Sequence, residues 1–409
     1  MTLEVKNEVN YSAFVVAVEK IIPLDNCDNV VGVPVGGYVA IVGKDTQVGD
    51  VLVVFPAESQ LSDEFVRTRN LYREATLNAD PAQKGYIEKN RRIKAMKFRG
   101  HRSDALAMPA STFDHPLVPG DVFDTIDGVE VCRKYVLPVN ENTSKPKTAQ
   151  EKAWKRVDDK FLPEHVDTEH YGRNSFKIDP DAHVVITQKL HGTSVRLART
   201  IVKRQLTWIE RLAKRLGVNV AETEFDHVFG SRKVIKDPNN PNQDHYYKTD
   251  LWSREGQKYA ALIPDNVVLY GELVGWVGDE PIQKGYTYNV PKGETHLYIY
   301  RVAVVSNDGH LYDLSWNGVK EFCAERGLNH VPELWNGTHW KFQDNAEKWL
   351  DMTYYPNFPQ AVPLAPESPC DEGVCIRVDG VLPFILKHKS PEFLRFESAR
   401  LDEGVEGLS

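Results

Sequence analysis

Short runs of alternating apolar and polar residues, separated by turn signals, dominate the first third of the sequence. Such runs occupy residues 12–22, 38–44, 50–56 and 91–100 and are rich in Val, Ile and Phe. Gly-Asp pairs stand directly before Val51 and Val122, where they indicate tight turns. Short strands at this spacing favour a small barrel of the OB type. We therefore predict an OB-like domain over residues 1–135, with a partly helical insertion over residues 59–90.

The rest of the chain changes character twice. Residues 136–175 are polar, charged and poor in β-branched residues, which predicts a linker carrying a helix. Residues 176–409 mix strand-like runs with helical stretches, the latter at 208–217 and 319–327. Strands are expected at residues 183–190, 266–276, 297–305, 373–378 and 383–389. The fold class is thus α+β: an OB-like β-barrel followed by a mixed α/β domain built on antiparallel sheets.

Composition excludes several classes of protein. The 409 residues are 41% hydrophobic and carry 50 Lys+Arg against 58 Asp+Glu, a net charge of −8, which indicates a globular chain rather than a disordered one. No apolar run reaches the roughly 18–20 residues that a membrane span needs, and the start lacks a signal-peptide pattern. We expect a cytoplasmic monomer without membrane association. Five scattered cysteines without a CxxC pair argue against structural zinc.

One stretch departs from the acidic average. Between Lys84 and Arg102 lie eight basic residues and only one acid, Glu88. This pattern predicts contacts with nucleic-acid phosphates, with Tyr86 and Phe98 available for stacking. The alternative without nucleic-acid binding is a solvated basic edge strand that deters aggregation. The predicted contact residues are Lys84, Arg91, Arg92, Lys94, Lys97, Arg99 and Arg102, and Arg199, Lys203, Arg204 and Lys214 extend the basic face.

Several strand ends carry polar groups suited to a nucleotide. Lys189 ends an apolar strand and begins the turn Lys-Leu-His-Gly, and Arg232 follows Gly230 and Ser231. Glu272 stands between glycines at the end of another strand, and a carboxylate there suits a hard metal ion or a sugar hydroxyl. Strand alternation places Tyr298 and Tyr300 on one face, where an aromatic ring can stack on a base. Each motif alone is more often part of a solvated turn or of the core than of a nucleotide site.

Two further motifs lie near the end of the sequence. Glu372 precedes a strand within Asp-Glu-Gly-Val-Cys. In Lys-His-Lys, period-two spacing aims Lys387 and Lys389 from the same face of a strand. Two ammonium groups side by side repel unless an anion lies between them, and a phosphate fits that place.

The order of these motifs is more specific than any one of them. Lys189, Arg232, Glu272, Tyr300, Glu372 and Lys387 follow one another at intervals of 43, 40, 28, 72 and 15 residues. This series resembles the nucleotidyltransferase motifs of covalent polynucleotide ligases and mRNA capping enzymes. The resemblance covers residues 188–389, about half of the chain.

Three features indicate which branch of these families the sequence resembles most. His191 stands where DNA ligases and capping enzymes mostly have Asp, and Lys-Leu-His-Gly-Thr is similar to the RNA ligase 2-like branch. Residues 390–409 are too few for the C-terminal OB domain of those other families, so we expect none. An OB-like module ahead of the nucleotidyltransferase is similar to the Deinococcus-type RNA ligases, the RNA ligase 5 group.

The resemblance implies an ATP-dependent RNA ligase with Lys189 as its nucleophile. The amine attacks the α-phosphate of ATP, the AMP passes to a 5′-phosphate end, and a 3′-OH then displaces AMP. The implied substrate is RNA or an RNA-containing nicked duplex, and the implied metal is Mg²⁺ or Mn²⁺ on Glu272 and Glu372. Tyr300 is the expected adenine stack. The implied nucleotide-binding residues are Gln188, Leu190, His191, Gly192, Arg232, Glu272, Tyr300, Glu372, Lys387 and Lys389.

Physical chemistry adds one requirement and leaves alternatives open. A free lysine has a pKa of about 10.4, so a nucleophilic lysine must lose its proton, which nearby positive charges favour. A non-catalytic nucleic-acid-binding protein with a decayed nucleotidyltransferase domain, or an ATP-dependent DNA ligase, remains an alternative. The preferred nick, the preferred metal and the roles of His191 and Arg301 stay open at this point.

Overall fold

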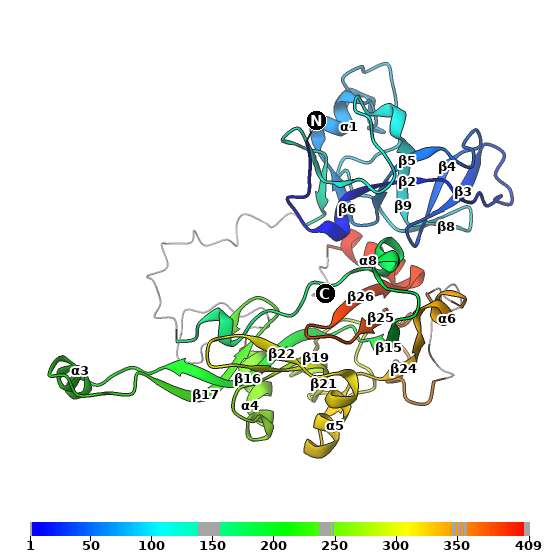
Figure 1. Cartoon of the computed structure of the whole chain (residues 1–409). Helices are drawn as coiled ribbons and strands as arrows, with labels where there is room; N and C mark the ends of the chain where they lie inside the picture. The colour runs from blue at the N-terminus through cyan, green and yellow to red at the C-terminus, as the bar shows by residue number, and fades with distance from the viewer. Residues whose placement is uncertain are drawn as a thin grey trace. The chain divides into compact units, whose positions relative to one another are not determined.

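The computed structural model describes residues 2–137, 156–236, 247, 249–345, 349–350, 352, 355 and 358–404. Its contacts form two compact units (Figure 1). Unit 1 comprises Met1–Pro138, Glu169–Ile178 and Leu386–Gly407. Unit 2 comprises Val139–Thr168, Asp179–Ile385 and Leu408–Ser409. Within the described residues, no helix is long and apolar enough to cross a membrane.

Unit 1 is built on a six-stranded sheet of order β10-β2-β5-β9-β4-β3. All neighbours pair antiparallel except β4 and β9, which are parallel. Among the described strands no pairing joins β3 to β10, so a closed barrel stays a prediction. The strands of this sheet are β2 (Ala13–Ala17), β3 (Val30–Val35), β4 (Tyr38–Gly43), β5 (Val51–Pro56), β9 (Ala105–Pro109) and β10 (Val122–Phe123).

Strand β5 explains why this sheet has apolar residues on both faces. Its sequence Val-Leu-Val-Val-Phe-Pro is a continuous apolar run rather than an alternating one. Val53 and Phe55 pack in one core cluster, whereas Leu52 and Val54 pack in another. Because successive side chains of a strand point to opposite faces, a run of this kind requires cover on both sides.

Smaller elements complete unit 1. Its helices are α1 (Asp63–Thr68), α2 (Tyr171–Asn174) and α8 (Pro391–Asp402). Its other strands are β1 (Leu3–Glu4), β6 (Ser59–Leu61), β7 (Met96–Phe98), β8 (His101–Ser103), β11 (Thr125–Ile126), β12 (Val129–Glu130), β13 (Cys132–Lys134) and β14 (Glu169–His170). Helix α8 comes from the end of the chain, and its Leu394 packs in the same core cluster as Leu52 and Val54.

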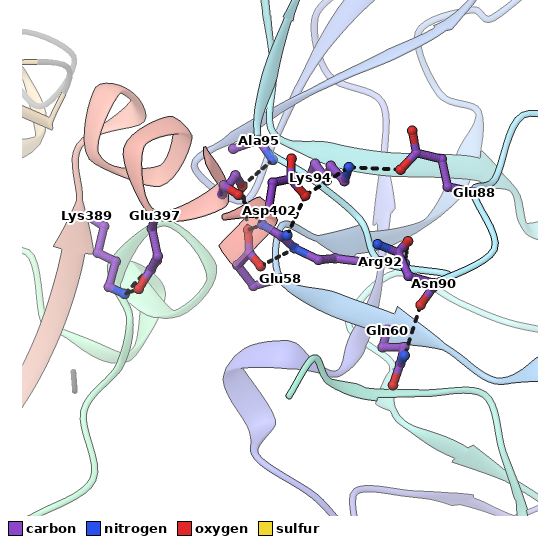
Figure 2. A network of polar contacts seen from close by, with 11 residues as sticks. Glu58, Gln60, Glu88, Asn90, Arg92, Lys94, Ala95, Lys389, Glu397 and Asp402 are labelled. Atoms are coloured by element: carbon purple, nitrogen blue, oxygen red, sulfur yellow. Dashed lines mark hydrogen bonds and ion pairs between the residues drawn. The ribbon is translucent and has the colours of Figure 1, made fainter. Parts of the chain in front are cut away.

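A buried ionic network fastens α8 inside unit 1 (Figure 2). Arg92 binds both carboxylate oxygens of Glu58, at 2.7 and 3.0 Å. The same guanidinium donates to Asp402 at 3.0 Å and to the Ser398 carbonyl at 2.7 Å. The Arg92 side chain is wholly buried. Because every face of this guanidinium is used, the network is a structural element of unit 1.

Unit 2 contains a large sheet of order β18-β17-β16-β19-β21-β22, with β20 on β19 and β23 on β21. The pairings are antiparallel except that of β21 with β23. Figure 1 shows β16 and β17 extending as a hairpin that carries α3 at its far end. The strands are β16 (Thr193–Lys203), β17 (Thr223–Gly230), β18 (Ile235–Lys236), β19 (Val267–Val277), β20 (Glu280–Pro281), β21 (Thr295–Val305), β22 (Leu311–Asp313) and β23 (Asn329–His330).

A second sheet of unit 2 places β15 (His183–Lys189) between β24 (Glu333–Thr338) and β25 (Gly373–Val378), both antiparallel to it. Strand β26 (Phe384–Lys389) begins in unit 2 and continues into unit 1, where it pairs with β14. The helices of unit 2 are α3 (Trp208–Arg215), α4 (Leu251–Tyr259), α5 (Trp316–Arg326) and α6 (His339–Gln343).

The α+β class is confirmed, and most predicted strands are present at their expected places. The exception is the run at residues 91–100, which contributes only the three-residue β7 because Arg91 and Arg99 take left-handed backbone angles (φ 57° and 49°). Residues 138–155 of the predicted linker lie outside the described residues. Its described remainder carries short helical turns at Asp159–Phe161 and in α2.

Candidate active site

Lys189 is the last residue of β15, a strand that is mostly buried. Residues 184–188 of β15 are buried between the two neighbouring strands, so the chain becomes half-exposed only at Lys189. Its ammonium Nζ donates to Glu372 Oε1 at 2.5 Å, and the Glu372 side chain is fully buried. Register explains the meeting, because Lys189 pairs with Gly373, the residue that follows Glu372. Two motifs 183 residues apart are therefore in contact.

Glu272 joins this pair from the large sheet. It lies on β19 opposite Ser194 on β16, and it accepts from the Ser194 hydroxyl at 3.2 Å and from the Gly192 amide at 3.1 Å. Burial and the negative charge of Glu372 raise the pKa of Glu272 to about 7, although Lys189 and both hydrogen bonds act in the opposite direction. The lysine and the two carboxylates thus form one electrostatic cluster.

Tyrosines and one arginine border the cluster. Tyr298 pairs with Glu272 across the strands β21 and β19, and Tyr300 stands two residues further on the same half-buried face. Burial and then the charge of Glu272 raise the pKa of Tyr300, whereas a hydrogen bond with Ser194 and the charge of Arg232 lower it. The structure therefore brings Arg232 and both tyrosines to the same part of the sheet as Glu272.

The turn after Lys189 is sterically confined. A Cβ at Gly192 would lie 2.2 Å from the Leu273 carbonyl oxygen, so only glycine fits there. Leu190 is buried beneath the turn. His191 places Nδ1 3.7 Å from Glu372 Oε2 and its ring edge-on to Tyr286, with ring centroids 4.8 Å apart. His191 therefore belongs to the carboxylate cluster rather than to the solvated surface.

Gln188 makes contacts other than the predicted one. Its amide Nε2 donates to Asp371 Oδ1 at 2.8 Å and to the Val362 carbonyl at 3.1 Å, while its Oε1 accepts from the Val362 amide at 2.8 Å. Both N–H bonds of this side-chain amide are therefore used within the protein. Asp371 also accepts from the Tyr355 amide, and burial raises its pKa to about 6. Gln188 and Asp371 thus connect the two strands that carry Lys189 and Glu372.

The contacts of Arg301 indicate a structural role. It is fully buried and binds both oxygens of Asp313, at 2.5 and 2.8 Å. Its guanidinium also stacks 4.5 Å above the Tyr270 ring. Arg301 therefore connects β21 with the neighbouring strand β22, which ends at Asp313.

Lys387 and Lys389 belong to unit 1, so their role toward a nucleotide stays a prediction. Both are half-buried, and the buried His388 between them points to the other face, as strand alternation predicts. The Lys389 ammonium binds both oxygens of Glu397 in α8, at 2.7 and 2.9 Å. A carboxylate, and not only a phosphate, is thus a partner of this lysine.

The predicted basic stretch divides into buried and exposed residues. Arg92 is removed from the predicted contact set because it is buried in the Glu58 network. Four others are engaged with the protein: Arg91 with Asp63, Lys94 with Glu88 and Asp402, Arg102 with Asp104, and Arg99 with the Asn26 carbonyl. The exposed basic and aromatic residues of the stretch are Lys84, Tyr86, Lys89, Lys97, Phe98 and Arg99.

The four additional basic residues are also paired with carboxylates. Arg199 binds Asp265 at 2.8 Å, Lys203 binds Asp158 at 2.8 Å, and Arg204 binds Glu210 at 2.9 Å. Lys214 pairs with Glu222. Neighbouring carboxylates therefore compensate much of their charge, which weakens the prediction of an extended basic face.

Sequence reasoning missed the residues that support the lysine turn from a loop. Tyr286 and Tyr288 lie in the segment between β20 and β21, and Tyr288 Oη accepts from the His191 amide at 2.7 Å. Irregular loops lack the periodicity that marks strands and helices. Asp371, by contrast, carried a signal, because it is an acid directly beside the predicted Glu372.

Comparisons with known proteins agree with this geometry. A family model described as RNA ligase matches residues 182–389, just over half of the 409-residue chain. No curated protein matches the chain in sequence.

Solved structures of the RNA ligase of Naegleria gruberi resemble this chain in fold. Its complex with pyrophosphate shares 15% identity at a TM-score of 0.61, covering 96% of this chain and 100% of that one. A mutant with ATP and Mn shares 17% identity at a TM-score of 0.56, covering 95% and 99%. Another mutant with AMP and Mn shares 17% at 0.57, covering 94% and 98%. At such identities the likeness shows the fold.

Proposed function

The chain belongs to the RNA ligase family, and from that premise we propose that it joins 3′-OH and 5′-phosphate ends of RNA at nicks in duplexes. As a member of this family it is an ATP-dependent ligase. Within the family we propose the RNA ligase 2-like branch, and in it the Deinococcus-type group with an N-terminal OB domain. The turn Lys-Leu-His-Gly-Thr and the strand-rich residues 1–135 support that placement.

One observation carries the proposal. A half-exposed lysine at a strand end contacts a fully buried carboxylate at 2.5 Å, and a second carboxylate belongs to the same charge cluster. A purely structural ion pair would have no need of a second acid whose pKa is raised to about 7. A nucleophilic amine beside hard oxygen ligands is the arrangement that phosphoryl and nucleotidyl transfer require.

The two carboxylates fit a divalent metal ion that completes its coordination with water and phosphate. Within the described part of the chain no group of three or more potential ligand side chains comes together. Mg²⁺ binds in this way, through one or two carboxylates plus substrate phosphates. Glu272 and Glu372 would hold the ion, which would offset the charge growing on the α-phosphate.

The residues of the chain then have distinct tasks. Lys189 Nζ loses a proton, forms a bond to the α-phosphate of ATP and releases pyrophosphate, which leaves lysyl-AMP. The AMP passes to the 5′-phosphate end, and the 3′-OH then displaces AMP to form the phosphodiester. Arg232 contributes positive charge beside the nucleotide, and Tyr300, with Tyr298 second, offers a ring for adenine. His191 orients toward Glu372 rather than toward bulk solvent.

We assign the grip on the nucleic acid to the N-terminal part of the chain. The domains proposed from the sequence are an OB-like module over residues 1–135, a linker over 136–175 and the nucleotidyltransferase over 176–409. Lys84, Lys97 and Arg99 are exposed, and Tyr86 and Phe98 leave 51% and 38% of their surface accessible. Exposed cations interleaved with aromatic rings suit phosphates and unstacked bases.

The direct test is intact-mass measurement after incubation with ATP and Mg²⁺ or Mn²⁺. We expect one AMP-sized increment that disappears on addition of pyrophosphate. Sealing is then compared on nicked duplexes whose 3′-terminal sugar is ribose or deoxyribose. Failure to adenylylate rejects the catalytic proposal in favour of a nucleic-acid-binding protein, and equal sealing of both nicks rejects the RNA preference.

A further inference from the structure

The segment between β20 and β21 contacts the turn that follows Lys189. Gln283 Nε2 donates to the Gly192 carbonyl at 2.8 Å, and Tyr288 Oη accepts from the His191 amide at 2.7 Å. Both side chains are more than nine-tenths buried. Two peptide groups of the turn are thus oriented by side chains from a distant segment, within three residues of the nucleophile.

The backbone at Tyr288 is constrained. Tyr288 and Asn289 are consecutive non-glycine residues in the left-handed region, with φ of 52° and 56°. Such a conformation persists only when surrounding contacts hold it, and it gathers at functional sites. Here the Val290 carbonyl accepts from the Trp276 indole at 2.9 Å, and the Asn289 side-chain Nδ2 donates to the Leu364 carbonyl at 3.1 Å. These contacts fix the direction in which the Tyr288 ring enters the site.

The turn itself connects β15, which carries Lys189, with β16, which carries Ser194. Its His191 and Gly192 peptides fall between the two strands, where regular strand pairing no longer orients them. Close approach to Leu273 confines Gly192 on the opposite side. A displacement of this turn would move Lys189 relative to Glu372, and small misplacements of a reacting group are costly to rate.

We propose that Tyr288 and Gln283 are positioning residues that hold the lysine turn in the geometry required for attack on ATP. The inference rests on the proposed function, since it assigns their effect to formation of lysyl-AMP. Neither residue needs to touch the nucleotide. Their effect is specific to the step in which Lys189 is the nucleophile.

The experiment compares two steps in Tyr288→Phe and Gln283→Met, which remove one hydrogen-bonding group each at nearly constant size. For lysyl-AMP formation we expect the single-turnover rate at saturating ATP to fall by about 10- to 100-fold, with the KM for ATP changed by less than about twofold. Sealing of a nick that already carries AMP on its 5′-phosphate, measured without ATP, should stay within about twofold, because Lys189 is not its nucleophile.

Tyr312→Phe is the matched control, because that tyrosine is exposed on β22 and loses the same hydroxyl. Equal losses in both steps would indicate general damage to the fold and overturn the proposal, as would an unchanged adenylylation rate in both variants. A purely structural role would lower the melting temperature without separating the two steps. If the unaltered protein forms no lysyl-AMP, the proposed function fails instead, so the two failures are distinguishable.

Discussion

Two cation–carboxylate pairs in this protein differ in how completely the protein surrounds the cation. In unit 1, Arg92 donates to both oxygens of Glu58, to Asp402 and to the Ser398 carbonyl, and its side chain is wholly buried. In unit 2, Lys189 makes one short contact with Glu372, and 20% of its side chain remains accessible. The first pair is saturated by the protein, whereas the second leaves room for another partner.

The difference lies in what surrounds each carboxylate. Burial and, last among the causes, the charge of Glu397 raise the pKa of Glu58, whereas Arg92 and the Ser398 hydroxyl lower it. For Glu272, beside the Lys189 pair, the like charge of Glu372 adds to burial and exceeds the effect of either hydrogen bond, so the pKa is raised to about 7. Two acids placed close together disfavour joint ionisation until a cation arrives. A binding site is thus recognised by incomplete compensation rather than by the presence of charges.

The largest effect is expected for Lys189→Ala. Adenylylation should fall by at least about 10⁴-fold, because no other group can form the phosphoramidate bond. Transfer of label from α-labelled ATP to the protein measures this. Lys292→Ala, at a lysine whose side chain is 62% exposed, is the control and should label normally. Undiminished labelling of the Lys189 variant would contradict a catalytic role for the Lys189–Glu372 pair.

Arg92→Met tests the structural role of the Arg92–Glu58 pair in unit 1. It leaves Glu58 buried without its guanidinium, which costs about 3–5 kcal/mol of folding free energy. Urea unfolding followed by fluorescence should show the loss, whereas Arg99→Met, at an exposed arginine in the same stretch, should shift the transition little. A stability for Arg92→Met equal to that of the unaltered chain would mean that the network is dispensable.

Glu372→Gln should lower metal-dependent adenylylation by about 100-fold, because a coordinating carboxylate and the counter-charge of Lys189 are both lost. The Mn²⁺ concentration at half-maximal rate should rise. An unchanged metal titration would count against coordination by Glu372. Glu325→Gln, at an acid whose side chain is 70% exposed, serves as the control.

The raised pKa of Glu272 predicts a pH-dependent stability. The ordinary glutamate value is 4.5 and the folded value is about 7, so between these pH values the unfolded chain releases a proton that the folded chain keeps. Rising pH therefore favours unfolding across this window. In metal-free buffer, Glu272→Gln should melt higher than the unaltered chain at pH 8 and equally at pH 4.5. A difference independent of pH would contradict the assignment.

The smallest effect concerns the exposed end of the basic stretch. Lys97→Ala together with Arg99→Ala should weaken binding of a nicked RNA duplex by about 3- to 10-fold and lower the salt dependence of binding by about two counter-ions. Filter binding at several salt concentrations measures both. Adenylylation should not change, since these residues act on the nucleic acid. If the variant and the unaltered chain bind with equal affinity and equal salt dependence, the stretch is a solvated basic edge rather than a nucleic-acid contact.

Local patterns predicted much of this molecule. Strands β15, β19, β21 and β25 match the predicted runs to within two residues at either end, because each is a dense apolar segment. Lys189, Glu272 and Glu372 meet as expected. The basic stretch was less informative, since composition records charge but not whether a carboxylate far along the chain, such as Asp402, neutralises it.

The sequence by itself determined the chemistry that is available: where most strands form, and that a lysine, two acids and two tyrosines stand in or directly beside strands. Tertiary structure decided which charges are compensated. Glu58 and Ser398 lie 340 positions apart and share one hydrogen bond, and Tyr288 reaches the lysine turn from 97 positions away. Burial and pairing depend on such long-range contacts, and no local periodicity encodes them.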